Sequence, residues 1–210
     1  LLTGRGGDDT YYVGSNDRIV ETAAGGFDTV KAAFSLDLGA LSGAILRYGN
    51  VEQAVLTGAA DLDLTARATA AASLVGNTGA NHLVGGNLAD TLVGAAGADT
   101  LTGGLGNDLF VYAALGESTP AAADWIMDFA AGDRIDLRRI DAIPGGGDNA
   151  FVLDAFGSVL PAAVGHVTQH LDVDGTTLLV DVFATGIAAP DMRIRLANHA
   201  GGLAAGDFVL

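Results

Sequence analysis

The sequence predicts an all-β protein in which a parallel solenoid of nine-residue units is followed by an antiparallel β cap. Residues 76–111 divide into four consecutive units with no insertion: GNTGANHLV, GGNLADTLV, GAAGADTLT and GGLGNDLFV. A fixed short period of this kind is typical of a solenoid. Beyond residue 150, two alternating apolar runs flank Asp174-Gly175, a pair typical of a type I′ hairpin turn. These observations together give the fold class.

Each unit combines a turn with a short strand. Gly opens the unit, and its first six places are rich in Gly, Asn and Asp, which favour turns and accept unusual backbone angles. The last three places form a short strand with one inward apolar residue at the eighth place. Two units make one coil, so residues 18 apart should stack at the strand spacing of roughly 4.8 Å.

The sixth place of the units holds Asn81, Asp90, Asp99 and Asp108. Stacking puts Asp90 beneath Asp108, and two carboxylates about 5 Å apart repel by roughly 3 kcal/mol at an effective dielectric of 20. A cation between them would remove this repulsion. Calcium fits the gap because its six to eight oxygen ligands lie at about 2.3–2.6 Å. The sequence therefore predicts Ca²⁺ as the cofactor, with several ions bound.

The repeated pattern resembles the RTX nonapeptide, which implies a calcium-binding parallel β-roll. The resemblance implies that each calcium ion lies between two turns that are two units apart. The first turn would supply the carbonyls of its second and fourth places, and the second turn those of its first and third places. Both turns would also supply their sixth-place side chains. One implied site comprises Gly86, Leu88, Asp90, Gly103, Leu105 and Asp108, and another comprises Asn77, Gly79, Asn81, Gly94, Ala96 and Asp99. Asp63 lies 18 residues before Asn81 and Glu117 lies 18 residues after Asp99, so both are predicted as further metal ligands. Leu88 departs from the expected Gly, and the neutral Asn81 should weaken its sites.

Residues 1–48 are expected to be a diverged version of the same architecture. Gly4, Gly7 and Asp9 occupy the first, fourth and sixth places of a repeat-like turn, and two polar turns with apolar strands follow. Asp9, with Asp17 and Asp28, is a candidate calcium ligand, although the spacings of these residues break the period.

Residues 49–117 are predicted to form the β-roll itself. The Ala-rich run at 66–73 favours a helix by propensity. It is nevertheless assigned to the solenoid, because the nine-residue frame from Gly49 and Gly58 into Gly76 is unbroken. The remaining segment, 118–210, is predicted to be the capping β region, with DWIMDF at 124–129 covering the last apolar layer.

DWIMDF and DRIDL, at 133–137, resemble the C-terminal region of serralysin-type secreted proteases and of alginate epimerase modules. The final residues, from Asp207 to Leu210, resemble the uncleaved signal of type I secretion substrates. These resemblances imply a secreted, extracellular protein whose partners are calcium and a type I exporter. The chain begins inside a repeat-like turn and lacks a Sec signal peptide, so we expect a fragment whose upstream part is missing.

Composition excludes several partners. Acidic residues outnumber basic residues 25 to 10, which gives a net charge of −15 and disfavours binding to nucleic acid or anionic membranes. No apolar run is long enough to span a membrane. Cysteine is absent, so disulfides and thiolate metal sites are excluded.

The sequence does not predict an enzyme. His166 and His170 are four residues apart, but the zinc protease motif H-E-x-x-H requires a helix and a Glu where this chain has Val167. The predicted function is a module that folds on meeting extracellular calcium and directs type I secretion of a parent protein. One alternative is a polysaccharide-binding module, whose only basic candidates are Arg134, Arg138, Arg139, Arg193 and Arg195. The other is a self-associating surface-layer or filament subunit joined through calcium or exposed strand edges.

Overall fold

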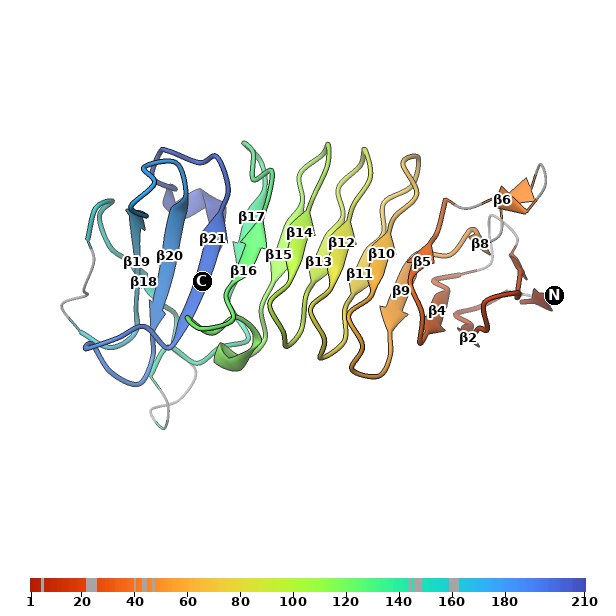
Figure 1. The fold of residues 1–210 in the computed structure, drawn as a ribbon, viewed down its shortest axis with the longest axis horizontal. Coiled ribbons are helices and arrows are strands. Elements are labelled where there is room, and N and C mark those ends of the chain that lie inside the picture. Colours follow the sequence, from red (N-terminus) through yellow and green to blue (C-terminus); the bar gives the residue numbers. More distant parts are fainter. Residues whose placement is uncertain are drawn as a thin grey trace.

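The protein is an elongated stack of short parallel strands that ends in antiparallel strands (Figure 1). A computed structural model describes residues 1–4, 6–21, 26–39, 41–42, 45–46, 48–143, 145, 149–158 and 163–210. Within these ranges the only helical elements are two 3₁₀ turns, η1 (Leu115–Glu117) and η2 (Ala205–Asp207). No helix in the described residues is long and apolar enough to cross a membrane. The predicted all-β fold class is confirmed.

Two sheets face each other along the stack, and a single coil contributes one strand to each. The eight-stranded sheet is parallel throughout and contains β2 (Thr10–Tyr12), β4 (Thr29–Ala32), β9 (Gln53–Leu56), β11 (Ser73–Val75), β13 (Thr91–Val93), β15 (Leu109–Val111), β17 (Arg134–Asp136) and β22 (Phe208–Val209). The parallel part of the nine-stranded sheet contains β5 (Leu36–Asp37), β10 (Asp63–Thr65), β12 (His82–Val84), β14 (Thr100–Thr102) and β16 (Asp124–Ile126). Its C-terminal part contains β21 (Met192–Leu196), β20 (Leu178–Phe183), β19 (His166–Leu171) and β18 (Val152–Leu153).

Smaller sheets complete the N-terminal end. A three-stranded parallel sheet consists of β1 (Leu2–Thr3), β3 (Ile19–Val20) and β8 (Tyr48–Gly49). An antiparallel pair consists of β6 (Leu41–Ser42) and β7 (Ile45–Leu46). This end therefore combines parallel strand stacking with one antiparallel pair.

The stacking interval of the central repeats agrees with the prediction. Leu83 pairs with Leu101 in one sheet, and Leu92 pairs with Phe110 in the other. Hydrogen bonds between successive coils join residues 18 apart. The nine-residue period therefore places equivalent positions of the turns directly above one another.

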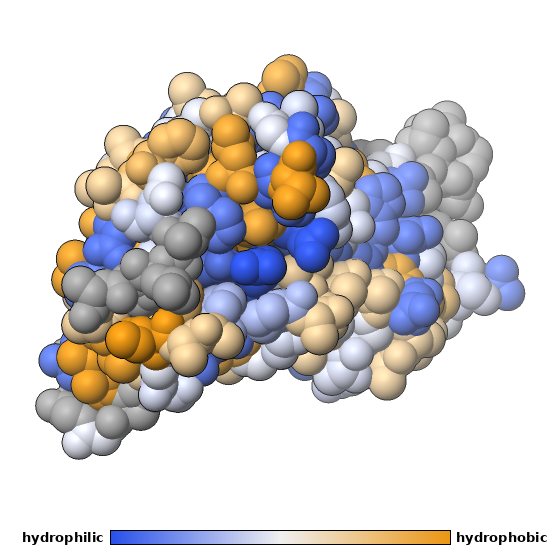
Figure 2. Space-filling view, turned by 60° about the vertical axis from the view of Figure 1, so that its left-hand side comes forward, coloured by the Kyte–Doolittle hydropathy of each residue, from blue (hydrophilic) through white to orange (hydrophobic). Residues whose placement is uncertain are grey.

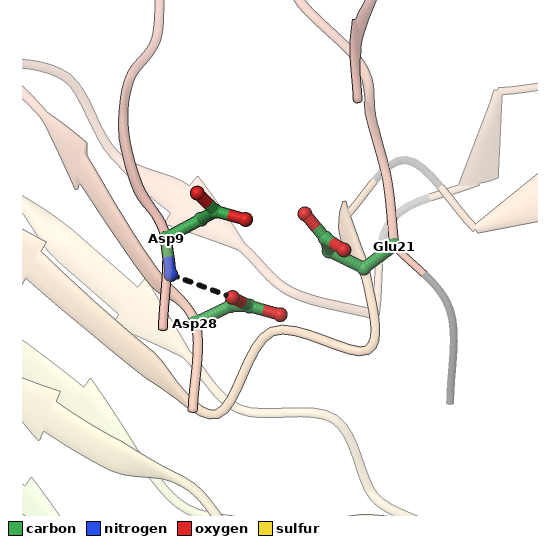
Figure 3. A group of neighbouring side chains, drawn as sticks. All are labelled: Asp9, Glu21 and Asp28. Atoms are coloured by element: carbon green, nitrogen blue, oxygen red, sulfur yellow. Dashed lines mark hydrogen bonds between the residues drawn. The ribbon is translucent and has the colours of Figure 1, made fainter. Parts of the chain in front are cut away.

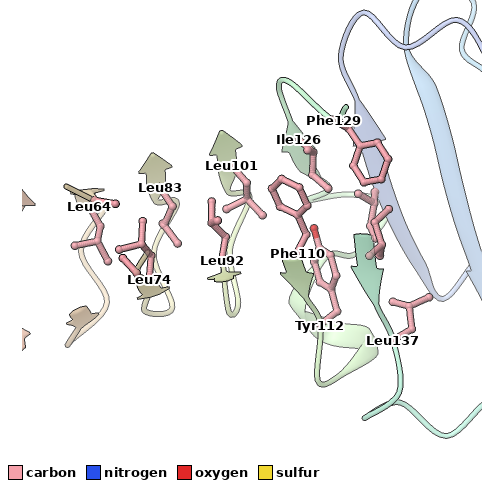
Figure 4. Close-up of a cluster of buried hydrophobic side chains, with 14 of the residues drawn as sticks. Leu64, Leu74, Leu83, Leu92, Leu101, Phe110, Tyr112, Ile126, Phe129 and Leu137 are labelled. Carbon is pink, nitrogen blue, oxygen red and sulfur yellow. The ribbon is translucent and has the colours of Figure 1, made fainter. Parts of the chain in front are cut away.

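The core is a ladder of apolar side chains between the two sheets (Figure 4). The middle residue of each three-residue strand points inward, because successive side chains of a strand alternate between its faces. Leu83, Leu92 and Phe110 are fully buried, and Leu101 is almost so. Full burial of such a side chain stabilises the fold by about 1.5–3 kcal/mol. The ladder therefore fixes the register that stacks the turns.

Upstream of the central repeats the register differs from the prediction. Leu64 pairs with Leu83 and Leu74 pairs with Ala54, so the nine-residue frame is interrupted rather than continuous. The Ala-rich run nevertheless stays within the stack, between β10 and β11. Its helix propensity is outweighed because Leu74 and Ala72 bury their side chains in the core.

Downstream, the parallel stack continues beyond residue 117, so the predicted roll boundary is too early. Leu101 pairs with Ile126, and Phe110 pairs with Ile135. The interval between coils here is 25 residues instead of 18, because an insertion containing η1 lengthens the connection. DWIMDF and DRIDL therefore add two strands to the roll, and Phe129 packs on Phe110 with ring centroids 6.1 Å apart.

The antiparallel cap is present, with two differences from the expected pairing. The β19–β20 hairpin has Leu171 opposite Leu178, so its connection is longer than a two-residue turn. Gly175 has a positive φ of 69° but Asp174 does not, which excludes the type I′ geometry. The Asp174 carboxylate instead accepts the N–H groups of Thr176 and Thr177, both at 2.8 Å. In addition, β18 pairs with β19 in parallel and not antiparallel orientation.

Candidate metal centre

In two of the central turns the sixth side chain accepts a hydrogen bond from the second residue of its own turn. Asp90 Oδ2 accepts a hydrogen bond from the Gly86 N–H at 2.5 Å, and Asn81 Oδ1 accepts one from the Asn77 N–H at 2.7 Å. These contacts satisfy N–H groups that have no partner in a β-ladder. The sixth side chain is consequently fixed in an inward position.

The sixth-place side chains form two columns, one beside each sheet. In both columns the N–H of each residue donates to the Oδ1 atom of the residue one coil further on, at 2.7–2.8 Å. The first carboxylate column, beside the eight-stranded sheet, consists of Asp90, Asp108 and Asp133. The second carboxylate column, beside the nine-stranded sheet, consists of Asn81, Asp99 and Asp124.

The column side chains are buried. Asp99 is completely inaccessible to solvent, and Asp108 is 1% exposed. The Oδ2 atom of each accepts no hydrogen bond from any residue that the structure describes. A buried acceptor without a partner costs roughly 1–3 kcal/mol, and more when it is charged. These oxygens are therefore suited to binding a cation.

Burial raises the pKa values of Asp90, Asp99, Asp108 and Asp124, and neighbouring negative charges add to the shift in the last three. Burial raises the pKa of Asp108 to about 6, and the charges of Asp133, Asp90 and Asp128 add to the shift. Burial likewise raises the pKa of Asp99 to about 7 and that of Asp124 to about 8. Without a bound cation, the fold disfavours the charged forms of these groups.

Glycines keep the gap between stacked turns open. A Cβ atom at Gly85 would overlap the carbonyl oxygen of Gly103 and lie 2.8 Å from Asp90 Oδ2. A Cβ atom at Gly76 would similarly overlap the carbonyl oxygen of Gly94. Backbone carbonyl and carboxylate oxygens thus converge between successive coils. Calcium prefers this mixture of oxygen ligands, so the residues present fit the ion.

The structure brings together part of each predicted ligand set. Gly103 lies with Asp90 and Asp108 at the first column, whereas Gly94 lies with Asn81 at the second. The structure therefore places the first-place carbonyls near the sixth-place side chains, and calcium binding by these groups stays a prediction.

The predicted ligands at the second, third and fourth places of the turns make other contacts or lie in exposed bends. The Gly86 carbonyl accepts the N–H of Leu105 at 3.0 Å, and Asn77 Oδ1 accepts the N–H of Gly79 at 2.8 Å. Leu88, Ala96 and Leu105 lie in the bends of their turns. Leu88 and Leu105 expose their side chains, so only their backbone oxygens could contribute. Binding by these residues stays a prediction.

Two predicted ligands lie outside the columns. Asp63 pairs with His82 instead of Asn81, and 70% of its side chain is exposed. Glu117 lies in η1, where its carboxylate accepts the Ala113 N–H at 2.7 Å. The position expected for Glu117 is occupied by Asp124, because the insertion shifts the count from 18 to 25 residues.

Sequence reasoning missed three acidic residues that follow the last repeat. Asp124 and Asp133 continue the columns. Asp128 accepts the N–H groups of Gly103 and Gly104 at 2.9 and 2.8 Å. The signal that could have found Asp124 and Asp133 is local: each is followed by one residue and then an inward Ile, as Asp90 is followed by Thr and Leu.

Asp9 belongs to an N-terminal continuation of the first column. Its N–H donates to Asp28 Oδ1 at 2.9 Å, and the Asp28 N–H donates to Glu52 Oε2 at 2.8 Å. Ala72 holds the next place and has no carboxylate, although its N–H donates to Asp90 Oδ1 at 2.6 Å. The acidic residues beside this sheet therefore fall into two groups separated by Ala72.

The two histidines of the HVTQH segment lie on a β-strand. His166 and His170 lie on strand β19, as expected from the β-branched sequence, and not on a helix. His166 Nδ1 lies 2.7 Å from Asp154 Oδ1. This arrangement lacks the helical placement of a zinc protease motif.

Stacked turns, inward carboxylates and glycine-lined gaps define a calcium-binding β-roll. The sequence model of the family described as Peptidase M10 serralysin C terminal matches residues 59–210, and that of the RTX calcium-binding nonapeptide repeat matches residues 1–20. The chain belongs to the serralysin C-terminal family. It carries RTX repeats, which imply calcium binding.

Solved structures with a similar arrangement include two subunits of the mannuronan C5-epimerase from Azotobacter vinelandii. The AlgE6R3 subunit is 26% identical with a TM-score of 0.49, and the match covers 73% of this chain and 80% of that one. The AlgE6R2 subunit is 25% identical with a TM-score of 0.49, and the match covers 74% and 91%. A search of curated proteins gave no match.

Proposed function

We propose that the chain is a non-catalytic module that folds when calcium becomes available outside the cell and that directs type I secretion of a parent protein. The first column would hold calcium between Asp90 and Asp108 and between Asp108 and Asp133. The second would do so between Asn81 and Asp99 and between Asp99 and Asp124. When bound, calcium supplies the positive charge that these buried carboxylates lack.

The observation that carries the proposal is the stacking of buried carboxylates one strand spacing apart. Their repulsion opposes folding when calcium is scarce, and their alignment favours folding when it is abundant. At a calcium concentration tenfold above a dissociation constant near 10⁻⁴ M, each site adds about 1.4 kcal/mol, and four such sites add about 6 kcal/mol. This amount is comparable with the stability of a whole domain.

The position of the last residues supports a link between folding and export. Phe208 is buried in the core, and β22 pairs with β17 of the roll. A signal in this segment would be accessible to an exporter only before the sheet forms. A chain kept unfolded by low calcium would therefore present the segment, and the folded chain would conceal it.

Asp108→Asn tests the proposal, with Asp63→Asn as the control. Asp108 lies in the middle of the first column, whereas Asp63 is exposed and outside it. Each substitution removes one negative charge and changes little volume. We expect Asp108→Asn to raise the calcium midpoint of folding about tenfold, because affinity depends on the number of charged ligands, and Asp63→Asn to leave it unchanged. Equal midpoints in the two variants would contradict the proposal.

Three of the five arginines on which the polysaccharide-binding alternative depends already have partners in the fold. Arg193 and Arg138 each bind a neighbouring carboxylate, at 2.6 and 2.7 Å respectively. Arg195 lies over the ring of Trp125, 5.2 Å from its centroid. These side chains already have partners and would need to leave them to bind a uronate.

The self-association alternative would need an exposed surface that fits another copy. Figure 2, which turns the C-terminal end forward, shows hydrophobic and hydrophilic patches interspersed over that face. Exposed apolar residues of the C-terminal region include Val152, Phe156 and Ile187. No described feature of this face favours a filament over the folding module.

A further inference from the structure

One long edge of the roll contains a shallow hollow. This edge, called the first turn edge, consists of the turns that lead into β4, β9, β11, β13, β15 and β17, in that order along the stack. Three residues connect β8 to β9, whereas six connect β12 to β13. The short turn leaves a hollow of about 310 Å³, and Phe27, Glu52, Ala71 and Ala89 are among the residues that line it.

The N-terminal end of this edge presents an aromatic ring beside two carboxylates. Asp28 is 1% exposed and accepts the Asp9 N–H at 2.9 Å, so its side chain points into the roll (Figure 3). The preceding residue, Phe27, points to the opposite side and is 49% exposed. The exposed Asp8 carboxylate accepts the Phe27 N–H at 2.8 Å, and Glu52 lines the same hollow. A positively charged group would therefore fit this end.

The middle of the first turn edge presents apolar side chains to solvent. Leu88 is 47% exposed and precedes Ala89, which lines the hollow together with Ala71. Both alanines are exposed. Burial of such apolar area against another surface stabilises an association.

The charged side chains of the middle turns are directed into the roll. Asp90 and Asp108 are each 1% exposed. The Arg67 guanidinium donates to the Tyr48 carbonyl at 3.2 Å. In a chain with a net charge of −15, this surface therefore allows two copies to approach with little direct repulsion.

The C-terminal end of the same edge is basic. Arg134 is exposed at the start of β17 and lines a second hollow, of about 270 Å³, with Asn107 and Gly132. Its guanidinium has no ion-pair partner among the residues that the structure describes. The edge thus runs from an acidic aromatic end through an apolar middle to a basic end.

This order makes the first turn edge complementary to itself. A two-fold axis between β11 and β13 exchanges β4 with β17 and β11 with β13. In a two-fold dimer both copies use the same patch. Arg134 of each copy then faces Phe27 of the other, and Leu88 of each faces Ala71 of the other.

We propose that two copies of the chain associate through this edge as a closed two-fold dimer. The Arg134 guanidinium packs on the Phe27 ring of the other copy and pairs with its Glu52 carboxylate. Leu88 enters the hollow beside Ala71. Because a two-fold dimer is closed, it does not grow into a filament. The dimer needs the folded roll but does not rest on calcium-triggered folding or on secretion.

Sedimentation velocity of the full 210-residue chain over a range of concentrations, in saturating calcium, tests the dimer. Arg134→Gln is compared with Arg139→Gln, because each removes one positive charge and Arg139 is exposed beyond the other end of β17. We expect the dissociation constant to rise at least tenfold in Arg134→Gln and to stay unchanged in Arg139→Gln. A wild-type chain that stays monomeric at millimolar concentration, or equal constants in the two variants, would overturn the dimer.

Phe27→Ala tests the aromatic end, with Phe156→Ala as the matched control. The two phenylalanines are 49% and 48% exposed, and Phe156 lies in the C-terminal region away from this edge. We expect Phe27→Ala to weaken the dimer at least tenfold and Phe156→Ala to leave it unchanged. The opposite result would place the contact at the C-terminal face and contradict the proposal.

Cross-linking tests the symmetry, because the chain contains no cysteine. Ala89 lies next to the proposed axis, whereas the two copies of Ala131, in the turn before β17, would lie about 24 Å apart, or five strand spacings of about 4.8 Å. We expect Ala89→Cys to form a disulfide-linked dimer under mild oxidation and Ala131→Cys to stay unlinked. No link in Ala89→Cys, or an equal link in Ala131→Cys, would overturn the two-fold arrangement. If the chain folds without calcium, the folding function fails and these experiments still decide the dimer.

Discussion

The sixth-place aspartates are the proposed calcium ligands of the roll, and the glycine that opens each turn leaves space beside them. The gap between coils is narrow: a single added carbon at Gly85 would overlap the Gly103 carbonyl and approach Asp90. The absence of a side chain at this glycine therefore allows the oxygens to converge.

Gly85→Ala should destabilise the protein by about 1–3 kcal/mol and weaken its calcium binding, because the methyl group must displace the Gly103 carbonyl. Gly186→Ala is the control, since a Cβ atom there meets no atom within 4 Å. Urea unfolding in saturating calcium measures the difference. Equal stability of the two variants would show that the gap is wider than described.

The raised pKa values predict how the calcium-free protein responds to pH. Burial raises the pKa values of Asp108, Asp99 and Asp124 to about 6, 7 and 8 in the folded state, above the unfolded value near 3.9. The folded state then binds more protons, so these groups stabilise it fully below about pH 4 and lose that contribution as the pH rises through 6–8.

We therefore expect chelator-dialysed protein to hold more β structure at pH 5 than at pH 8, as measured by circular dichroism. Addition of calcium should reverse this order, since protons compete with the ion for the same oxygens. The double variant Asp99→Asn, Asp124→Asn should show a smaller pH dependence without calcium. A calcium-free protein that is more stable at pH 8 would rule out this account of the columns.

The placement of these residues was predictable where the period holds and not elsewhere. The nine-residue count placed Asp90 against Asp108 and Asn81 against Asp99, as the structure has them. The same count misplaced Glu117, because an insertion that carries no periodic signal brings Asp124 to that position.

At the scale of the element, short strands are stabilised by the ladder of inward side chains. Three-residue strands are too short to form a stable sheet alone, and each gains its stability from one buried residue and from its neighbours. Phe110 on β15 joins the regular repeats to the C-terminal layers, because it pairs with Leu92 and Ile135 and packs on Phe129.

Phe110→Ala should lower the free energy of unfolding by about 3–5 kcal/mol, because it leaves a cavity between two layers of the core. Leu105→Ala, at an exposed turn residue, is the control and should change stability by less than about 0.5 kcal/mol. Urea unfolding in saturating calcium again measures both. A loss below 1 kcal/mol for Phe110→Ala would mean that this layer is not closely packed.

Element boundaries were predictable to different degrees. Strict alternation and β-branched residues identified the strands of the cap, including β19 and β20. The type I′ turn was wrong because the Asp174 side chain satisfies two nearby N–H groups and favours a wider connection. The end of the roll was placed too early because bulky strands were expected to cover the stack, whereas β16 and β17 extend it.

The whole molecule combines a high negative charge with a fold that buries five of its 25 acidic side chains in the two columns. Its net charge of −15 opposes compaction, and the buried aspartates oppose it most strongly. The ladder of apolar side chains alone must balance this repulsion when calcium is scarce. We therefore place the control of folding in the columns and not in the core.

Circular dichroism during a calcium titration of the chelated chain tests this central claim most directly. We predict a cooperative change from coil to β structure in millimolar calcium and no comparable change in magnesium, which requires a smaller octahedral site. A chelated chain that is already fully folded, and whose spectrum and melting temperature do not respond to calcium, would contradict the account.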